Sequence, residues 1–565
     1  MDPSGSLYSL SIRLPDKGPG QGPGRTHQVR RDVVVAVNSR EAPILSLYGT
    51  IFESTTSSPQ VQDIPTGIPK LAAVESQEYF DILRRWLEDC DNNHEGCEPE
   101  DTDSSFATLP TRLINVREKN PKIVRLLETQ HSHITPGSRY IALSHPWGDR
   151  SEHNHYCTTK LNIANHKIGI LFNALPNTFQ NAIEVTRQLG VQYLWIDSLC
   201  IVQGEDGDFE DEAKHMETVF SSAYSVFFKT RPVRKVVRFE RPGEPAFYVC
   251  ESIDNFQRDV IEGTLNTRGW VLQERALARR TIYFAENQTY WECGEGVRCE
   301  TMIRMRNKQA ELLGDPRFPG VATNSSKGGR IYLYEFLYKQ YSRLKFTRIC
   351  DRPLAIAGIE QRLIRAFNSQ GGYGVFTDFF GRGLLWQRDV KLPSQTMKPI
   401  QFPESQQYQV PSWSWMAYEG AIDFMELPFG GIEWEKEEIC SPWSHSSPIL
   451  PSVSRESIIS NTSWHTAETN GRNDLKAVAR DFSALADPDI VYDKGERPEN
   501  RIVRCVIVGR KKMTTGLKSD RIHYVLVVSQ KQEAASQATY ERVGVGALPE
   551  KLITIRGPGL RVQVI

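Results

Sequence analysis

The segment TRGWVLQERAL, residues 267–277, places a tryptophan four residues before a glutamate. In a helix this spacing puts Trp270 and Glu274 on the same face. A carboxylate beside an aromatic ring could act as a catalytic group next to an aromatic platform. The same two residues also suit a structural role, in which Glu274 pairs with an arginine of this segment and Trp270 fills the core. The segment alone leaves both interpretations open.

Three further polar residues follow apolar runs that are typical of strands. Ser144 and Trp147 lie at and after the end of YIALSH, and Asp197 lies near the end of VQYLWIDSLCI. Because ligands of parallel sheets bind beyond the carboxyl ends of the strands, we expect these three residues to form a substrate site with Trp270 and Glu274. A structural role is open for each, since Trp147 can fold onto the core and Asp197 can cap the following turn.

Cysteines at two places in the sequence could take part in chemistry. Cys200 stands between apolar residues with no histidine next to it, which indicates a buried core thiol and not a nucleophile. Cys90, His94 and Cys97 form a Cys-x3-His-x2-Cys pattern of zinc-type ligands, but a structural zinc needs four. A fourth ligand could come only through the tertiary structure, from Cys293, Cys299, His131 or His133. We therefore predict no metal at these residues and no bound cofactor.

The elements that must position these residues alternate between strands and helices. An amphipathic helix, PNTFQNAIEVTRQLG, separates the first two apolar strands, and Gly190 supplies its C-cap. A second helix, FEDEAKHMETVFSSAY, opens with acids that suit the positive helix N-terminus and leads to a strand at SVFF. Strand, helix, strand, helix, strand predicts an α/β fold with a parallel sheet covered on both faces.

Composition shifts along the chain suggest six segments. The first is rich in Gly and Pro, the fifth is rich in Ser and Thr, and the last carries short β-branched runs. We predict a disordered tail (1–30), an N-terminal flanking region (31–135), the α/β core (136–300), a mostly helical extension (301–440), a Ser-rich surface loop (441–475) and a small C-terminal β module (476–565).

The bulk composition excludes several classes of partner. The 565 residues include 68 Lys and Arg against 69 Asp and Glu, so no charge excess favours nucleic acid or an anionic membrane. No apolar run approaches the ~18 residues of a membrane span, and no secretory signal opens the chain. Ten cysteines without such a signal predict reduced thiols. We expect a cytoplasmic protein that binds neither nucleic acid nor membrane.

Three spaced motifs resemble the fungal heterokaryon-incompatibility (HET) domain. YIALSHPWGD resembles its first motif, LWIDSLCIVQGEDGDFEDEAKHMETVFSSA its second and TRGWVLQERALARRTIYF its third. WLEDCDNNHEGC and LPTRLINV resemble the segment before this domain, and VPSWSW resembles one that follows it. The resemblance covers roughly residues 80 to 420, in the order of the family. His145 and Pro146 depart from it, because an aromatic and a variable residue are more usual there.

The resemblance implies a role in fungal nonself recognition, where fusion of genetically different hyphae triggers cell death. The trigger would be a protein partner or self-association. HET domains are also similar to TIR domains, which implies a TIR- or flavodoxin-like parallel core. Some TIR domains cleave the nicotinamide bond of NAD with a glutamate in a Ser-x-Trp-Cys-x-x-Glu segment. Residues 267–274 fall on that segment, which would make Glu274 the catalytic residue and NAD a small-molecule substrate.

Two other functions remain open from the sequence. The chain could be a non-catalytic module for homotypic assembly and signalling, which would tolerate Glu274→Gln. It could also be an accessory enzyme of a secondary-metabolite biosynthetic cluster, acting on a small metabolite.

Overall fold

The computed structural model describes most of the chain between residue 71 and the C-terminus. The described residues are 10–11, 32–37, 40–49, 71–74, 76–94, 97, 109–135, 137–147, 156–221, 223–226, 236–239, 247–251, 253–305, 313, 315, 317–320, 326–392, 396–403, 410–443, 474–512, 521–531 and 539–565. For the described residues before 50 and for those from 221 to 251, only the backbone is described. The predicted tail (1–30) and Ser-rich loop (441–475) lie almost wholly outside these residues.

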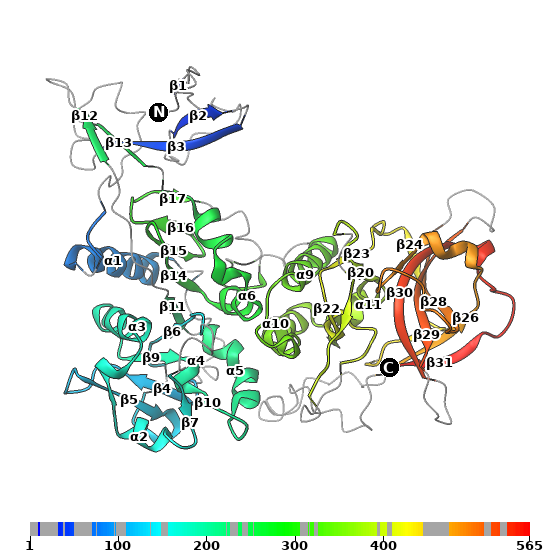
Figure 1. Cartoon of the computed structure of the whole chain (residues 1–565), viewed down its shortest axis with the longest axis horizontal. Helices are drawn as coiled ribbons and strands as arrows, with labels where there is room; N and C mark the ends of the chain where they lie inside the picture. Colours follow the sequence, from blue (N-terminus) through cyan, green and yellow to red (C-terminus); the bar gives the residue numbers. More distant parts are fainter. Residues whose placement is uncertain are drawn as a thin grey trace. The chain divides into compact units, whose positions relative to one another are not determined.

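The chain forms two compact units (Figure 1). The first comprises Met1–Asn266 and Glu274–Phe318, and the second comprises Thr267–Gln273 and Pro319–Ile565. Helix α6 (Gly269–Leu277) begins in residues of the second unit and ends in residues of the first.

A ten-stranded sheet forms the centre of the first unit. Its order is β17 (Arg304–Met305), β16 (Gly296–Cys299), β15 (Thr289–Cys293), β14 (Arg280–Phe284), β11 (Ala223–Val226), β6 (Tyr140–Leu143), β9 (Tyr193–Ile196), β4 (Arg112–Asn115), β5 (Ile123–Glu128) and β8 (Ile170–Leu171). The pairings β14–β11, β11–β6 and β6–β9 are parallel, as the strand–helix alternation predicts. The mixed α/β class is thus confirmed.

The rest of this sheet departs from the TIR- or flavodoxin-like parallel expectation. The pairings from β14 to β17 and from β9 to β8 are antiparallel. The connections between β14, β15 and β16 are a few residues long, and a parallel pairing would need a crossover of about a dozen or more. Parallel strands therefore make up only the middle of the sheet.

Two helices cover the parallel strands from opposite sides (Figure 1). α3 (Asn177–Gln188) links β6 to β9, and α5 (Phe209–Ser221) links β9 back to β11 on the other side of β6. Because crossovers between parallel strands are right-handed, reversing the direction along the sheet moves the second helix to the opposite face. α3 buries Phe179 and Ile183 as expected, and Gly190 after it has φ +77°.

Segments flanking the parallel strands complete the first unit. α1 (Gln77–Asn93) is capped by Ser76, and its Tyr79 hydroxyl lies 2.9 Å from Thr289 Oγ1 on β15. Smaller elements are β7 (Thr158–Thr159), α2 (Ile163–Ile168), α4 (Asp197–Cys200) and β10 (Val202–Gln203). A separate antiparallel sheet has the order β1 (Leu10–Ser11), β2 (Asp32–Val37), β3 (Arg40–Gly49), β13 (Phe247–Glu251) and β12 (Val236–Phe239).

The second unit combines an aromatic helical part with a β part. α9 (Lys327–Ser342), α10 (Ala357–Phe367) and α11 (Phe380–Leu384) are its helices in the described residues, and α9 packs Tyr338 against Phe376 and Trp415. After α11 the chain forms short strands and turns. The expected helical extension over 301–440 is therefore helical only in part, because prolines recur beyond Leu384 and interrupt a helix.

An eight-stranded sheet occupies the C-terminal part. Its order is β24 (Ile432–Trp434), β28 (Val503–Lys511), β29 (Ile522–Gln530), β30 (Thr539–Pro549), β31 (Leu560–Val564), β26 (Leu475–Arg480) and β25 (Ile439–Cys440), with β27 (Ile490–Tyr492) beside β30. The β-branched runs noted in the sequence form β28 to β31. The described residues contain no helix that is both long and apolar enough to cross a bilayer.

Candidate functional site

The candidate site lies where β6 and β9 end. Leu143 pairs with Ile196, so the next residues, Ser144 and Asp197, leave neighbouring strands side by side. The chain turns towards α3 after β6 and towards α5, on the opposite face, after β9. In open α/β sheets, ligands bind beyond the strand ends at such a reversal of chain direction.

Ser144 and Glu274 form one pair at these strand ends. The Ser144 hydroxyl donates a hydrogen bond to Glu274 Oε2, and Ser144 is buried whereas Glu274 is partly exposed. Glu274 belongs to α6, which precedes β14, so two segments far apart in the sequence meet here. The contact places Glu274 at the end of the strand that carries Ser144.

Asp197 has three polar neighbours, two of which donate hydrogen bonds to its carboxylate. Trp147 Nε1 donates to Asp197 Oδ2 at 2.6 Å, and the Ser198 backbone N–H donates to Oδ1 at 2.7 Å. His145 Nδ1 lies 3.8 Å from Asp197 Oδ1. Asp197 is the first residue of α4, whose N-cap residue is Ile196, so the bond from Ser198 is a local contact within the first turn and not a helix cap. The bond to Trp147 shows that Asp197 also faces the loop after β6.

Trp270 makes a different contact. Burial raises the pKa of the Asp351 carboxyl, and the Arg348 guanidinium and a hydrogen bond from Trp270 oppose that rise. Trp270, Arg348 and Asp351 all belong to the second unit. The structure therefore brings Ser144, Trp147, Asp197 and Glu274 to the strand ends, and it places Trp270 in contact with Asp351 of the second unit.

Backbone hydrogen bonds to Lys345 fix the start of α6. The Gly269 N–H donates to the Lys345 carbonyl at 2.9 Å, and the Lys345 N–H donates to the Thr267 carbonyl at 2.7 Å. A Cβ at Gly269 would lie 2.0 Å from Phe346 Cζ. The glycine of the TRGW sequence thus permits a close approach that any side chain would prevent.

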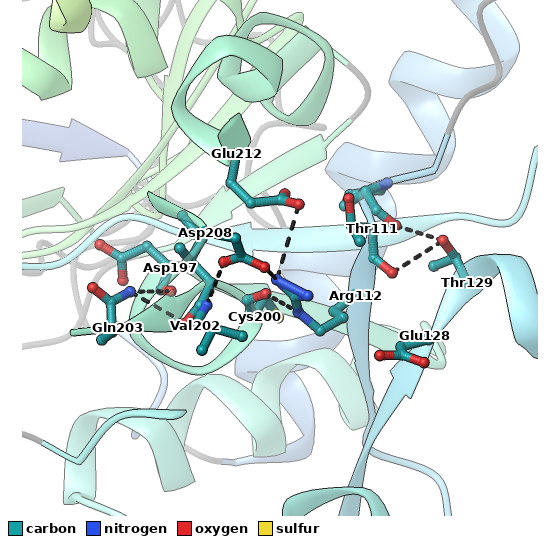
Figure 2. A network of polar contacts seen from close by, with 12 residues as sticks. Thr111, Arg112, Glu128, Thr129, Asp197, Cys200, Val202, Gln203, Asp208 and Glu212 are labelled. Atoms are coloured by element: carbon teal, nitrogen blue, oxygen red, sulfur yellow. Dashed lines mark hydrogen bonds and ion pairs between the residues drawn. The ribbon is translucent and has the colours of Figure 1, made fainter. Parts of the chain in front are cut away.

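A buried arginine braces the loop that carries Asp197 (Figure 2). Arg112, on β4, donates from Nε to the Cys200 carbonyl at 2.6 Å and pairs with Asp208, while Glu212 Oε1 lies 3.9 Å away. Asp208 also accepts the Val202 N–H at 2.8 Å. Arg112 therefore ties the connection between β9 and α5 to the flanking strand.

Sequence reasoning did not single out Arg112 or the pairing of His145 with Asp197. The available signal was the arginine at the start of the strand-like segment RLIN, because a charge on a buried strand requires a partner. For His145 the signal was its position next to Ser144. Burial raises the pKa of Cys200 to about 12, which is consistent with the inert core thiol that the sequence predicts.

The site offers two carboxylates, each of which accepts a hydrogen bond from a neutral side chain, Ser144 for Glu274 and Trp147 for Asp197. A carboxylate can stabilise a developing cation or accept hydrogen bonds from sugar hydroxyls. The residues with metal-ligand chemistry, Cys90, His94, Cys97 and Cys293, form a group of their own that includes neither carboxylate.

Comparison with known families decides the identity of this part of the chain. Residues 140–274 match the family model described as "Heterokaryon incompatibility protein (HET)". The chain carries a HET domain. The matched region of this HET domain begins at the first residue of β6 and ends at Glu274, so it contains Ser144, Trp147 and Asp197. No curated protein and no solved structure matches the chain.

Proposed function

We propose that the HET domain acts in fungal nonself recognition by cleaving the N-glycosidic bond of NAD, and that this loss of NAD leads to cell death. The observation that carries the proposal is the meeting of Glu274 and Asp197 with Ser144 and Trp147 beyond β6 and β9. The trigger is a protein partner or a second copy of the chain.

The reaction assigns a role to each carboxylate. The bond between ribose C1′ and nicotinamide nitrogen breaks, its electron pair leaves with neutral nicotinamide, and positive charge appears on the ribose ring. Glu274 stabilises that charge, and Asp197 accepts hydrogen bonds from ribose hydroxyls. Water then attacks C1′ and loses a proton, which gives ADP-ribose. Ser144 and Trp147 hold the two carboxylates in position.

The test compares wild type, Glu274→Gln and Glu262→Gln. Cell death is measured in a fungal host, and nicotinamide release and thermal stability are measured on the purified proteins. The amide introduced by Glu274→Gln can still accept the hydrogen bond from Ser144, but it lacks the charge. We expect nicotinamide release to fall about 10²–10³-fold in Glu274→Gln. Glu262 is exposed and accepts a bond from Gln257, so Glu262→Gln controls for loss of a carboxylate elsewhere in the unit.

The outcomes separate the proposal from its rivals. Loss of nicotinamide release and of cell death together, with thermal stability unchanged, supports catalysis at Glu274. Cell death that persists in Glu274→Gln without NAD loss contradicts it.

A second candidate, homotypic assembly, is favoured by exposed apolar residues of the HET domain. Leu161, Ile168 and Leu171 are 95%, 75% and 63% exposed, and Leu171 lies on β8, an edge strand of the ten-stranded sheet. Exposed apolar side chains beside an open edge favour association. Replacing all three by serine should reduce self-association in light scattering, whereas Leu485→Ser, at an exposed site in the second unit, should not.

A further inference from the structure

Four metal-ligating side chains meet in the first unit, outside the site described above. Cys90 lies in the last turn of α1, His94 is the C-cap residue of that helix, Cys97 follows, and Cys293 ends β15. All four are buried. The three sulfurs and one histidine nitrogen all lie within 4.8 Å of one another.

We propose that these four residues bind one structural zinc ion. A tetrahedral zinc with Zn–S bonds of about 2.3 Å separates its ligand atoms by roughly 3.8 Å, so the four atoms need only small inward shifts to bind it. Three thiolates and an imidazole suit zinc, whereas calcium and magnesium prefer oxygen ligands. An iron–sulfur cluster would spread its ligands over several irons, which a group this compact does not accommodate.

The neighbours of His94 suit a metal ligand. His94 Nδ1 lies 3.4 Å from Cys293 Sγ and is thus the nitrogen that faces the sulfurs. On the opposite side of the ring, Nε2 lies 3.8 Å from Asp89 Oδ2 and 3.2 Å from Arg298 Nη2. With zinc on Nδ1 the ring proton resides on Nε2, and Asp89 Oδ2, 3.8 Å away, reaches hydrogen-bond distance after a small shift of either side chain. A carboxylate in this position orients metal-binding histidines and strengthens them as ligands.

Arg298 completes this arrangement. Its Nη1 lies 2.5 Å from Asp89 Oδ2, so it holds the carboxylate next to His94. Without zinc, Arg298 Nη2 can donate to Nε2 while the proton of Nδ1 points to Cys293. Zinc takes the Nδ1 lone pair, so the ring proton moves from Nδ1 to Nε2. Arg298 Nη2 then turns away from Nε2, and Asp89 can accept the Nε2 proton.

Cys293 is the ligand that the sequence could not assign. The prediction of no metal rested on three local ligands, and the tertiary structure places Cys293 beside them. Cys90 and Cys97 precede the residues matched by the HET model, and Cys293 follows them. Zinc would therefore join α1 to β15 and close a long loop of chain that includes the HET domain. Closing this loop lowers the conformational entropy of the unfolded chain more than that of the native one, and so stabilises the fold.

The test measures metal in the full-length chain, purified without a metal-affinity step. We expect about one zinc per chain by elemental analysis in wild type and less than about a tenth of that in Cys90→Ser and Cys293→Ser. Cys299→Ser is the matched control, because Cys299 is a buried thiol of β16 that bonds Thr301 and lies outside the four ligands. It should keep its zinc.

A second measurement covers the case in which the serine variants fail to fold. Wild-type chain refolded with cobalt(II) should show the visible bands of a tetrahedral thiolate site, and added zinc should remove them. Wild type without zinc and without these cobalt bands overturns the proposal. Zinc that persists in Cys293→Ser also overturns it. A disulfide between any two of these cysteines, in protein kept under reducing conditions, overturns it as well.

Discussion

Replacing Arg112 by methionine should destabilise the first unit strongly. Methionine keeps much of the length and apolar stem of arginine but removes the charge and every donor. Arg112 is only 5% exposed, so water cannot replace what is lost. The change therefore probes the polar bracing of the loop between β9 and α5 and leaves most of the packing in place.

The expected decrease in the free energy of unfolding follows from the three partners of Arg112. The Cys200 carbonyl loses its 2.6 Å bond inside the core, at about 1–3 kcal/mol for an unsatisfied buried acceptor. Glu212, with a side chain 9% exposed, loses the cation near it, at roughly 1–2 kcal/mol. Asp208, whose side chain is 32% exposed, rehydrates and adds less than about 1 kcal/mol. These contributions sum to about 2–6 kcal/mol, a range that includes the ~3–5 kcal/mol typical of a buried ion pair that loses one member.

The assay is urea unfolding read by circular dichroism, combined with amide hydrogen exchange of peptides within 193–221. Exchange is needed because a chain of two units need not unfold in one transition. Arg117→Met is the control, since Arg117 is exposed and only donates to the Gly190 and Arg187 carbonyls at 3.3 and 3.4 Å. A loss below about 1 kcal/mol in Arg112→Met, or one equal to the control, would refute the reasoning.

Three further predictions concern other sites. Burial raises the pKa of Glu360 from 4.5 to about 7, so its contribution to stability is fully present below about pH 4.5 and is lost as the pH rises through about 7. Glu360→Gln should remove about 3 kcal/mol of this pH dependence, measured by urea unfolding at about pH 4.5 and about pH 8. Trp147→Phe keeps the ring but loses the 2.6 Å bond to Asp197, and should lower nicotinamide release about tenfold without a matching loss of thermal stability. Gly269→Ala must displace Phe346 and should cost about 1–3 kcal/mol in thermal unfolding, whereas an unchanged melting temperature would show that the ring moves freely.

Local patterns predicted the middle of the first unit. The alternation of apolar runs with amphipathic helices gave the parallel strands β6, β9 and β11, and the strand-end rule placed Ser144 next to Asp197. These features depend on residues close in sequence, where periodicity and helix caps are informative.

Features that depend on residues far apart in the sequence could not be predicted from it. Helical spacing put Trp270 and Glu274 on one face, but it could not show that Asp351 contacts the ring. Arg112 and Cys293 lie outside the HET match, and their partners are set by the antiparallel strands on either side of the parallel ones. No local pattern specifies which flank a strand joins, because pairing preferences depend on neighbours that only the tertiary structure supplies.

The limits of the HET match have a consequence for experiments on fragments. The match contains β6, β9 and β11, but β4, which pairs with β9, precedes it, and β14, which pairs with β11, follows it. A fragment cut at residues 140 and 274 would leave β9 and β11 as two open edges and would lose the partner of Cys200 on β4. Open edges of this kind pair with other chains, so such a fragment should precipitate or form oligomers unrelated to biological assembly. An expression fragment that keeps residues 71–318 retains both neighbouring strands.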